Sequence, residues 1–214
     1  MNTPYVDELR SGKLLAQEEN NNHNKLLYKT IQKDILYLTK NGIQNDDVTI
    51  SKNDPDRALY AYPLKHYNYW DEHLIENQID LGALGENLVL SGVNEFTTFI
   101  GDTFKFGEAI IQVSQPLQPK LLPHYPFSSK EFISQMKQTG KTGWFYRVIE
   151  EGEVKGDVEL ELIDRPYPQW SIAAINEVMY IDKHNLRAAY ELGNCELLSS
   201  NWKKVFKRRL QSLP

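Results

Sequence analysis

A single cation, Lys120, lies inside a proline-rich stretch, IIQVSQPLQPKLLPHYPF, residues 110–127. The stretch begins with the alternating pattern of a strand and continues as an apolar loop. Its stiffening residues are Pro116, Pro119, Pro123 and Pro126. An ammonium group held there could make a point-charge contact with an anionic ligand, or it could face solvent while its stem covers Leu121 and Leu122. The residues themselves leave both interpretations open.

Histidine and cysteine provide no second chemical motif. His66 and His73 lie seven residues apart without a third ligand at a suitable spacing, so we interpret them as core or surface histidines. The only cysteine, Cys195, follows Gly193, and nothing near it predicts a lowered pKa, which favours a buried structural thiol. One cysteine excludes an internal disulfide and a cysteine-based zinc site. Glycine-rich phosphate loops, GxSxG and HExxH do not occur.

Length and composition indicate one main globular domain with an extension. The chain has 214 residues, 41% hydrophobic and 25% charged, with 12 tyrosines and 4 tryptophans for an aromatic core or pocket lining. A net charge of −5 argues against nucleic-acid binding, which depends on clustered cations. There is no apolar segment after a basic start and no run as long as a membrane span, so we expect a cytoplasmic protein that does not bind membranes.

The elements that must position Lys120 are predicted to be mainly strands. Short strands are expected at 87–92, 99–106 and 108–114, with residues 107–108 as the tight turn of a hairpin. The runs 143–149 and 157–163 are expected to form another hairpin. The polar segment 18–24 is predicted to be a solvated loop, and residues 26–39 could form strands or a helix. This is the pattern of a barrel or sandwich.

Helices are predicted around and after these strands. One should span about 63–77, with Pro63 at its first position, and another about 129–139, with a capping box and Gly140 as its stop. Three more, 171–180, 182–193 and 199–210, form a tail, so the predicted organisation is a barrel domain, 1–164, and a three-helix region, 165–214. The last helix has an apolar stripe and cationic faces. These faces could contact an acidic partner or simply be solvated.

Several stretches together resemble the MOSC family, named for the C-terminal domain of molybdenum cofactor sulfurase, in its YiiM-like bacterial branch with a helical tail. The resembling stretches are GIQNDD at 42–47, PDRALYAYP at 55–63, HYNYW at 66–70, GENL at 85–88, GD at 101–102, IQVSQP at 111–116 and GKTGWFYRV at 140–148. The resemblance implies a β-barrel-like MOSC domain. In active members it also implies a molybdenum cofactor that reduces N-hydroxylated compounds such as hydroxylaminopurine, with an electron-transfer partner protein.

The chain departs from the family pattern at the residues expected to do the chemistry. Alignment on Gln115, Pro116 and Pro119 places Lys120 where the family presents a cysteine thiolate to molybdenum. A lysine is normally an ammonium group without a lone pair for a metal. Where the family has His-Gly-Gly, the chain has Lys52-Asn53-Asp54, and Asn45 replaces an expected glycine.

The resemblance therefore implies a cationic pocket without its metal ligand. Its cofactor-binding residues would be Lys52, Asn53, Asp54, Arg57, Asn87, Gln115 and Lys120. Such a pocket could hold a small anionic ligand or a pterin cofactor through lysine and arginine contacts. Alternatively, Arg57 braces the domain by pairing with Asp54, Asp56 or Glu86, and Asn87 satisfies backbone groups. Three functions remain open: a molybdenum-dependent reductase, a non-redox binding protein, and an interaction protein acting through its tail helices.

Overall fold

The computed structural model describes residues 3–12, 29–47, 54–73, 79–120 and 129–211. The predicted loop 18–24, Lys52, Asn53, and the pair Leu121 and Leu122 lie outside the described residues. No helix within the described ranges is both long and apolar enough to cross a bilayer.

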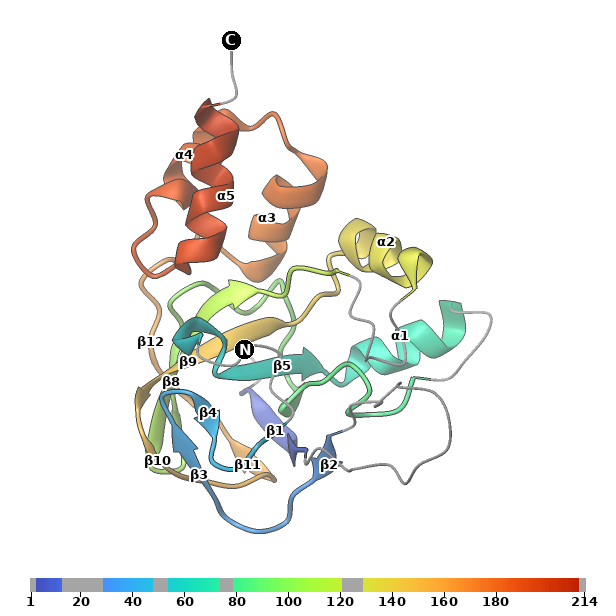
Figure 1. The fold of residues 1–214 in the computed structure, drawn as a ribbon, viewed down its shortest axis with the longest axis vertical. Helices are drawn as coiled ribbons and strands as arrows, with labels where there is room; N and C mark the ends of the chain where they lie inside the picture. The colour runs from blue at the N-terminus through green and yellow to red at the C-terminus, as the bar shows by residue number, and fades with distance from the viewer. Residues whose placement is uncertain (1–2, 13–28, 48–53, 74–78, 121–128, 212–214) are drawn as a thin grey trace.

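Most strands belong to one curled sheet. Their bounds are β1 Tyr5–Ser11, β2 Thr30–Ile31, β5 Leu59–Pro63, β6 Leu88–Ser91, β7 Thr103–Phe106, β8 Ala109–Pro116, β9 Trp144–Glu150, β11 Val158–Glu159 and β12 Glu161–Asp164. In the described part of the chain this sheet has nine strands, ordered β11-β1-β6-β5-β9-β8-β7-β12, with β2 beside β1. The two outer strands, β11 and β12, are separated in sequence by Leu160 alone, so the sheet must curl until its edges approach one another. Figure 1 shows the resulting half-barrel, which confirms the predicted mainly β, barrel-like fold.

A smaller sheet lies beside the half-barrel. It consists of β10 Gly152–Val154, β3 Leu36–Thr39 and β4 Gly42–Ile43, in the order β10-β3-β4. The stretch 26–39, for which strands and a helix were both open, therefore contributes strands β2 and β3 where it is described.

The interior of the half-barrel is a continuous apolar cluster. Val113 of β8 pairs in register with Tyr146 of β9, and both are buried together with Ile111, Phe104 and Trp144. Alternation along β8 and β9 places Ile111 and Val113, and Trp144, Tyr146 and Val148, in this cluster. Burial of each such side chain contributes roughly 1.5–3 kcal/mol relative to exposure, which makes this cluster the main source of stability.

One predicted hairpin is confirmed and the other is wrong. Phe106 and Ala109 face each other across the two-residue turn between β7 and β8, and Gly107 has the positive φ of +59° that a tight turn requires. By contrast, β9 pairs with β5 and β8, not with residues 157–163. Those residues form β11 and β12, which lie at opposite edges of the sheet. The segment between them and β9 is taken up by β10, which pairs with β3.

The two helices beside the sheet are α1 Lys65–His73 and α2 Lys130–Thr139. Pro63 was expected at the first helical position but is the last residue of β5, so α1 begins later than predicted. The local signals for α2 are confirmed, because Ser129 Oγ accepts a hydrogen bond from Phe132 N and Gly140 ends the helix with φ +69°.

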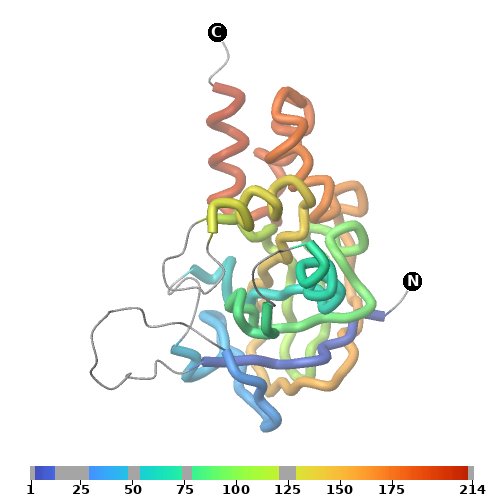
Figure 2. Tube along the Cα trace, turned by 90° about the vertical axis from the view of Figure 1, so that its right-hand side faces the viewer, coloured from blue at the N-terminus to red at the C-terminus, as the bar shows by residue number. Residues whose placement is uncertain are grey.

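The tail consists of α3 Ile172–Asn176, a π-helical turn η2 Glu177–Ile181, α4 Leu186–Gly193 and α5 Ser200–Gln211. α4 begins later than the predicted residue 182, and its N-cap is Asn185, whose side chain accepts a hydrogen bond from Ala188 N. Figures 1 and 2 show these helices together at one end of the molecule, beyond the sheet. Leu192, Trp202 and Phe206 belong to the same buried cluster as the barrel interior, so tail and barrel share one core. Burial also raises the pKa of the Cys195 thiol.

Candidate functional site

Arg57 and Gln115, which belong to separate elements, come together at Phe145 of β9. Arg57 ends the short 3-10 helix η1 Pro55–Arg57, and its Cζ atom lies 5.6 Å from the centroid of the Phe145 ring. Gln115 of β8 is the direct antiparallel partner of Phe145. Tyr60 of β5 is its partner on the other side, with ring centroids 5.1 Å apart. The sheet thus gathers two predicted site residues around the Tyr60–Phe145 pair.

Asn87 lies beside this pair, but its side chain is occupied within the protein. Its Oδ1 atom accepts a hydrogen bond from Tyr60 N at 3.2 Å. Its Nδ2 atom donates to Asp46 Oδ2 at 2.9 Å and to Arg10 O at 3.1 Å. Asn87 therefore joins β1, β5 and the turn after β4. Its side chain thus satisfies backbone groups, which is the alternative to ligand binding that the sequence left open.

Arg57 has one of its three expected bracing partners. Its Nε atom lies 3.4 Å from Asp54 Oδ2. Asp56 is bound instead by Arg147, at 2.8 Å, and Glu86 accepts hydrogen bonds from Tyr67 and Gly82. The Arg57 side chain is thus braced by Asp54 while its guanidinium carbon stays within cation–π range of Phe145.

Gln115 carries a buried acceptor that the described residues leave unused. The side chain is 0% exposed, and its Nε2 atom donates to Pro116 O at 3.3 Å. Its Oε1 atom has no hydrogen-bond partner among the described residues. Buried acceptors are normally paired, so this oxygen is a place where a ligand N–H group would be stabilised. Lys120, by contrast, is exposed beyond the end of β8.

A buried charge pair next to Asn87 was not predicted. Lys29 Nζ lies 3.1 Å from Asp46 Oδ2, and the two side chains are 0% and 1% exposed. Burial lowers the pKa of Lys29, while Asp46 opposes that shift. Asp46 also accepts a hydrogen bond from Gly12 N at 3.0 Å. The GIQNDD stretch pointed to Asp46, but no spacing or motif marked Lys29, which follows a polar, low-complexity segment.

The Glu86 carboxyl group makes the stability of this region pH-dependent. Burial raises its pKa above the ordinary 4.5, although hydrogen bonds from Tyr67 and Gly82 partly offset the effect. The folded chain therefore keeps a proton that the unfolded chain releases, so this group lowers the free energy of unfolding as pH rises from 4.5 through the raised pKa.

For Glu86→Gln we expect a free energy of unfolding that improves relative to wild type as pH rises through that window. Both donors, Tyr67 and Gly82, bind Oε1 of Glu86, and Oε2 has no hydrogen-bond partner among the described residues. The amide nitrogen of a glutamine can therefore take the place of Oε2 without facing another donor. Urea denaturation at a series of pH values measures the difference. The exposed Glu161→Gln is the matched control. A constant gap between Glu86→Gln and wild type across the series would contradict the expectation.

The two α1 histidines have separate surroundings. His66 Nε2 lies 2.6 Å from Glu95 Oε2, in a buried pair whose other carboxylate oxygen accepts Gly143 N at 2.8 Å. The His73 ring stacks on Tyr69, with centroids 4.0 Å apart. Among the described residues no group of three or more His, Cys, Asp or Glu side chains could hold a metal ion.

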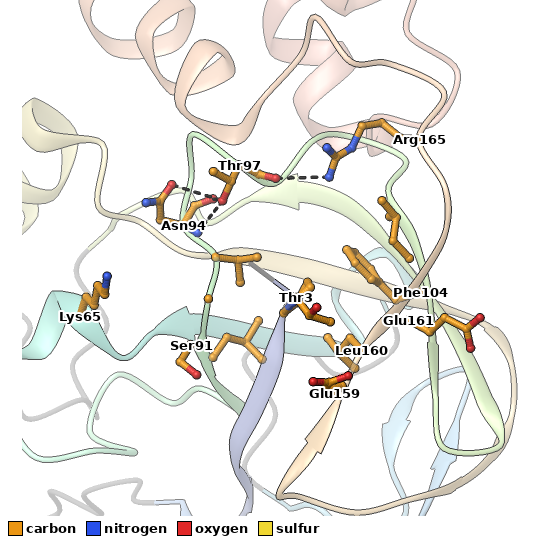
Figure 3. A pocket seen from close by; sticks show the side chains of 15 residues that line it. Thr3, Lys65, Ser91, Asn94, Thr97, Phe104, Glu159, Leu160, Glu161 and Arg165 are labelled. Carbon is orange, nitrogen blue, oxygen red and sulfur yellow. Dashed lines mark hydrogen bonds between the residues drawn. The ribbon is translucent and has the colours of Figure 1, made fainter. Parts of the chain in front are cut away.

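Two cavities in the described structure lie away from the Tyr60–Phe145 pair. The larger, about 940 Å³, lies at the mouth of the half-barrel, where Leu160 and Phe104 line it and Arg165 reaches across to Thr97 O at 3.3 Å (Figure 3). The smaller, about 370 Å³, is lined by residues of α1, α2 and α3, among them His66 and Asn176. Arg57, Asn87, Gln115 and Lys120 line neither cavity.

The comparisons with known proteins agree with this architecture. The family model described as "MOSC domain" matches residues 47–161, and the model described as "YiiM-like, 3-alpha helix domain" matches residues 170–213. Protein YiiM of Escherichia coli is 38% identical over 81% of this chain and 79% of its own length. The crystal structure of YiiM from Geobacillus stearothermophilus superposes with a TM-score of 0.78 at 30% identity, covering 97% of this chain and 99% of that one. A protein named "Reductase" from Gibberella moniliformis is 28% identical over 97% of this chain, which spans 37% of that longer protein.

Proposed function

Because the chain belongs to the MOSC-domain family and carries the YiiM-like three-helix domain, we propose that its barrel, residues 1–164, binds a phosphate-bearing pterin of the molybdopterin class. The pocket would be bordered by Arg57, Gln115 and Lys120. The observation that carries the proposal is the buried, unpartnered Gln115 Oε1 atom, next to the same aromatic ring as the Arg57 guanidinium.

Each residue would take the part of the ligand that its chemistry suits. Gln115 Oε1 would accept a ring N–H group, which removes the cost of an unpaired buried oxygen. Arg57 would offer a planar fork of donors to phosphate oxygens, and Lys120 a compact charge. Asn87 would act indirectly, by fixing β5 through Tyr60 N.

The residues present do not fit a molybdenum centre held by a protein thiolate. When bound, the family's metal supplies the reducing chemistry for N-hydroxylated compounds. The chain has one cysteine, and Cys195 is buried in the turn between α4 and α5, where burial keeps its thiol protonated. Lys120 presents an ammonium group without a lone pair. We therefore favour ligand binding as the function and derive no reductive step.

Pterin content tests this proposal. The chain is expressed in a host that makes molybdopterin, purified, denatured and oxidised, and the released fluorescent pterin is measured per chain. Lys120→Met should lower the pterin content up to about fivefold, because an ionic contact made by an exposed side chain contributes up to about 1 kcal/mol. Gln118→Met, at an exposed position of the same segment, is the matched control. A wild-type chain without pterin, or equal contents in the two variants, would contradict the proposal.

The second candidate function is a reductase of N-hydroxylated compounds that receives electrons from a partner protein. The relative named "Reductase" favours it. The two candidates differ in whether the natural chain carries metal, which the Lys120→Cys experiment in the Discussion measures.

A further inference from the structure

The turn formed by Asp54 and the 3-10 helix η1, residues 54–57, has no apolar anchor of its own. None of the residues of η1 is buried. Inside the turn, Asp56 N donates to Asp54 Oδ1 at 3.2 Å and Arg57 N donates to Asp54 O at 2.8 Å. Its placement over the sheet therefore depends on polar contacts from other elements. We call residues 54–57 the arginine turn.

Two sheet residues hold the arginine turn at Asp56. Ser114 Oγ of β8 donates to Asp56 O at 2.5 Å. Arg147 of β9 binds Asp56 Oδ1 through both Nε and Nη2, each at 2.8 Å. The Arg147 side chain is 17% exposed, so this charged contact is largely shielded from solvent and is stronger than a surface ion pair.

The same arginine also reaches the tail. Its Nη2 atom donates to Leu197 O at 2.9 Å, in the segment between α4 and α5, and its Nη1 atom donates to Gln112 Oε1 at 3.0 Å. The rigid guanidinium fork thus ties three elements together, which a lysine could not do.

Two further contacts connect the tail with this region. Ser199 N, just before α5, donates to Ser114 O at 3.0 Å. Asn201 Nδ2 of α5 lies 3.4 Å from Asp54 Oδ2, the oxygen that also faces Arg57 Nε. The start of α5 therefore contacts both the carboxylate that braces Arg57 and the strand that carries Gln115.

We infer that Arg147 is a positioning residue, and that the tail segment 197–201 and Arg147 together hold the arginine turn so that Arg57 faces the ligand. The three-helix region is then part of the binding site although none of its side chains needs to touch the ligand. The role given to Arg57 rests on the proposed function. The coupling of tail and turn rests on the contacts alone.

Hydrogen–deuterium exchange of the full chain tests the coupling without any ligand. In Arg147→Met the amides of Asp54, Asp56 and Arg57 should exchange about tenfold faster than in wild type, because the turn has lost a contact that no apolar burial replaces. Arg147→Lys, which keeps the pair with Asp56 but not the fork, should give an intermediate rate. Asn201→Ala, at an exposed position, should change the rate in the same direction without endangering the core. Arg187→Lys is the matched control, since Arg187 is 91% exposed and, within the described ranges, its ion pair is with Glu191 of the same helix, α4.

Pterin content gives the second readout. If Arg147 only stabilised the fold, a variant as thermally stable as the wild type would keep its pterin. It should fall in Arg147→Met and recover partly in Arg147→Lys. Unchanged exchange of residues 54–57 in both Arg147 variants would overturn the inference. Faster exchange with undiminished pterin would overturn it as well, because the turn would then not present a ligand contact. A wild-type chain that carries no pterin refutes the proposed function instead, and the exchange rates still decide the coupling.

Discussion

Replacing Gly143 by alanine is expected to lower the free energy of unfolding by about 3 kcal/mol. Gly143 has φ +65°, where an L-residue with a side chain costs roughly 1–2 kcal/mol. Its added Cβ would also collide with Ala61 O, a backbone atom of β5, and lie 2.8 Å from Tyr62 Cδ2. Overpacking of this kind costs about 1–3 kcal/mol, and the Gly143 N–H group must keep its hydrogen bond to Glu95 meanwhile.

Gly140 provides a matched control a few residues away. Its φ of +69° is nearly the same, but an added Cβ would meet nothing closer than Asn176, at 4.0 Å. Gly140→Ala should therefore cost only the conformational part, about 1 kcal/mol. Urea denaturation of both variants separates the two contributions. Equal losses would show that the packing against β5 is not as tight as the geometry indicates.

A part of the fold can be predicted from the sequence when the residues that interact in it lie close together along the chain. The turn at Gly107 and the caps of α2 were predictable because each signal lies within a few residues of the backbone that it controls. The pairing of residues 157–163 was not, because their partners are β1 and β7, more than fifty residues upstream, and alternation alone cannot choose among strands of similar pattern.

The candidate site divides in the same way. Family resemblance proposed Arg57, Asn87 and Gln115 as site residues. Only the structure shows that Asn87 is occupied internally and that Gln115 Oε1 has no partner among the described residues. Arg147 lies within the family-like stretch 140–148, but the sequence assigns it no role, because its three partners come from η1, β8 and the tail. Lys29 could not be recognised, since the burial that makes it notable is a property of the assembled barrel.

Lys120→Cys is expected to gain molybdenum when the chain is expressed in a host that makes the cofactor. The wild-type chain should carry almost none, because its ammonium group offers no lone pair and its only cysteine is buried in the tail. If Lys120 stands where the resemblance expects the family's cysteine, a thiolate there would supply the soft ligand that this metal prefers, so metal content should rise toward about one atom per chain. Elemental analysis, normalised to protein concentration, is the measurement.

The control for this gain is a cysteine on the same segment at a different place. Gln118 is exposed two residues before Lys120, so Gln118→Cys adds an accessible thiol without placing it at the family position. If Gln118→Cys gains as much metal as Lys120→Cys, the binding reflects thiol exposure and not a prepared pocket. If the wild-type chain already carries stoichiometric molybdenum and reduces hydroxylaminopurine, Lys120 does not disable the site, and the reductase is the correct function. Metal gained only by Lys120→Cys would mean that the barrel has kept a cofactor pocket from which a single ligand atom is missing.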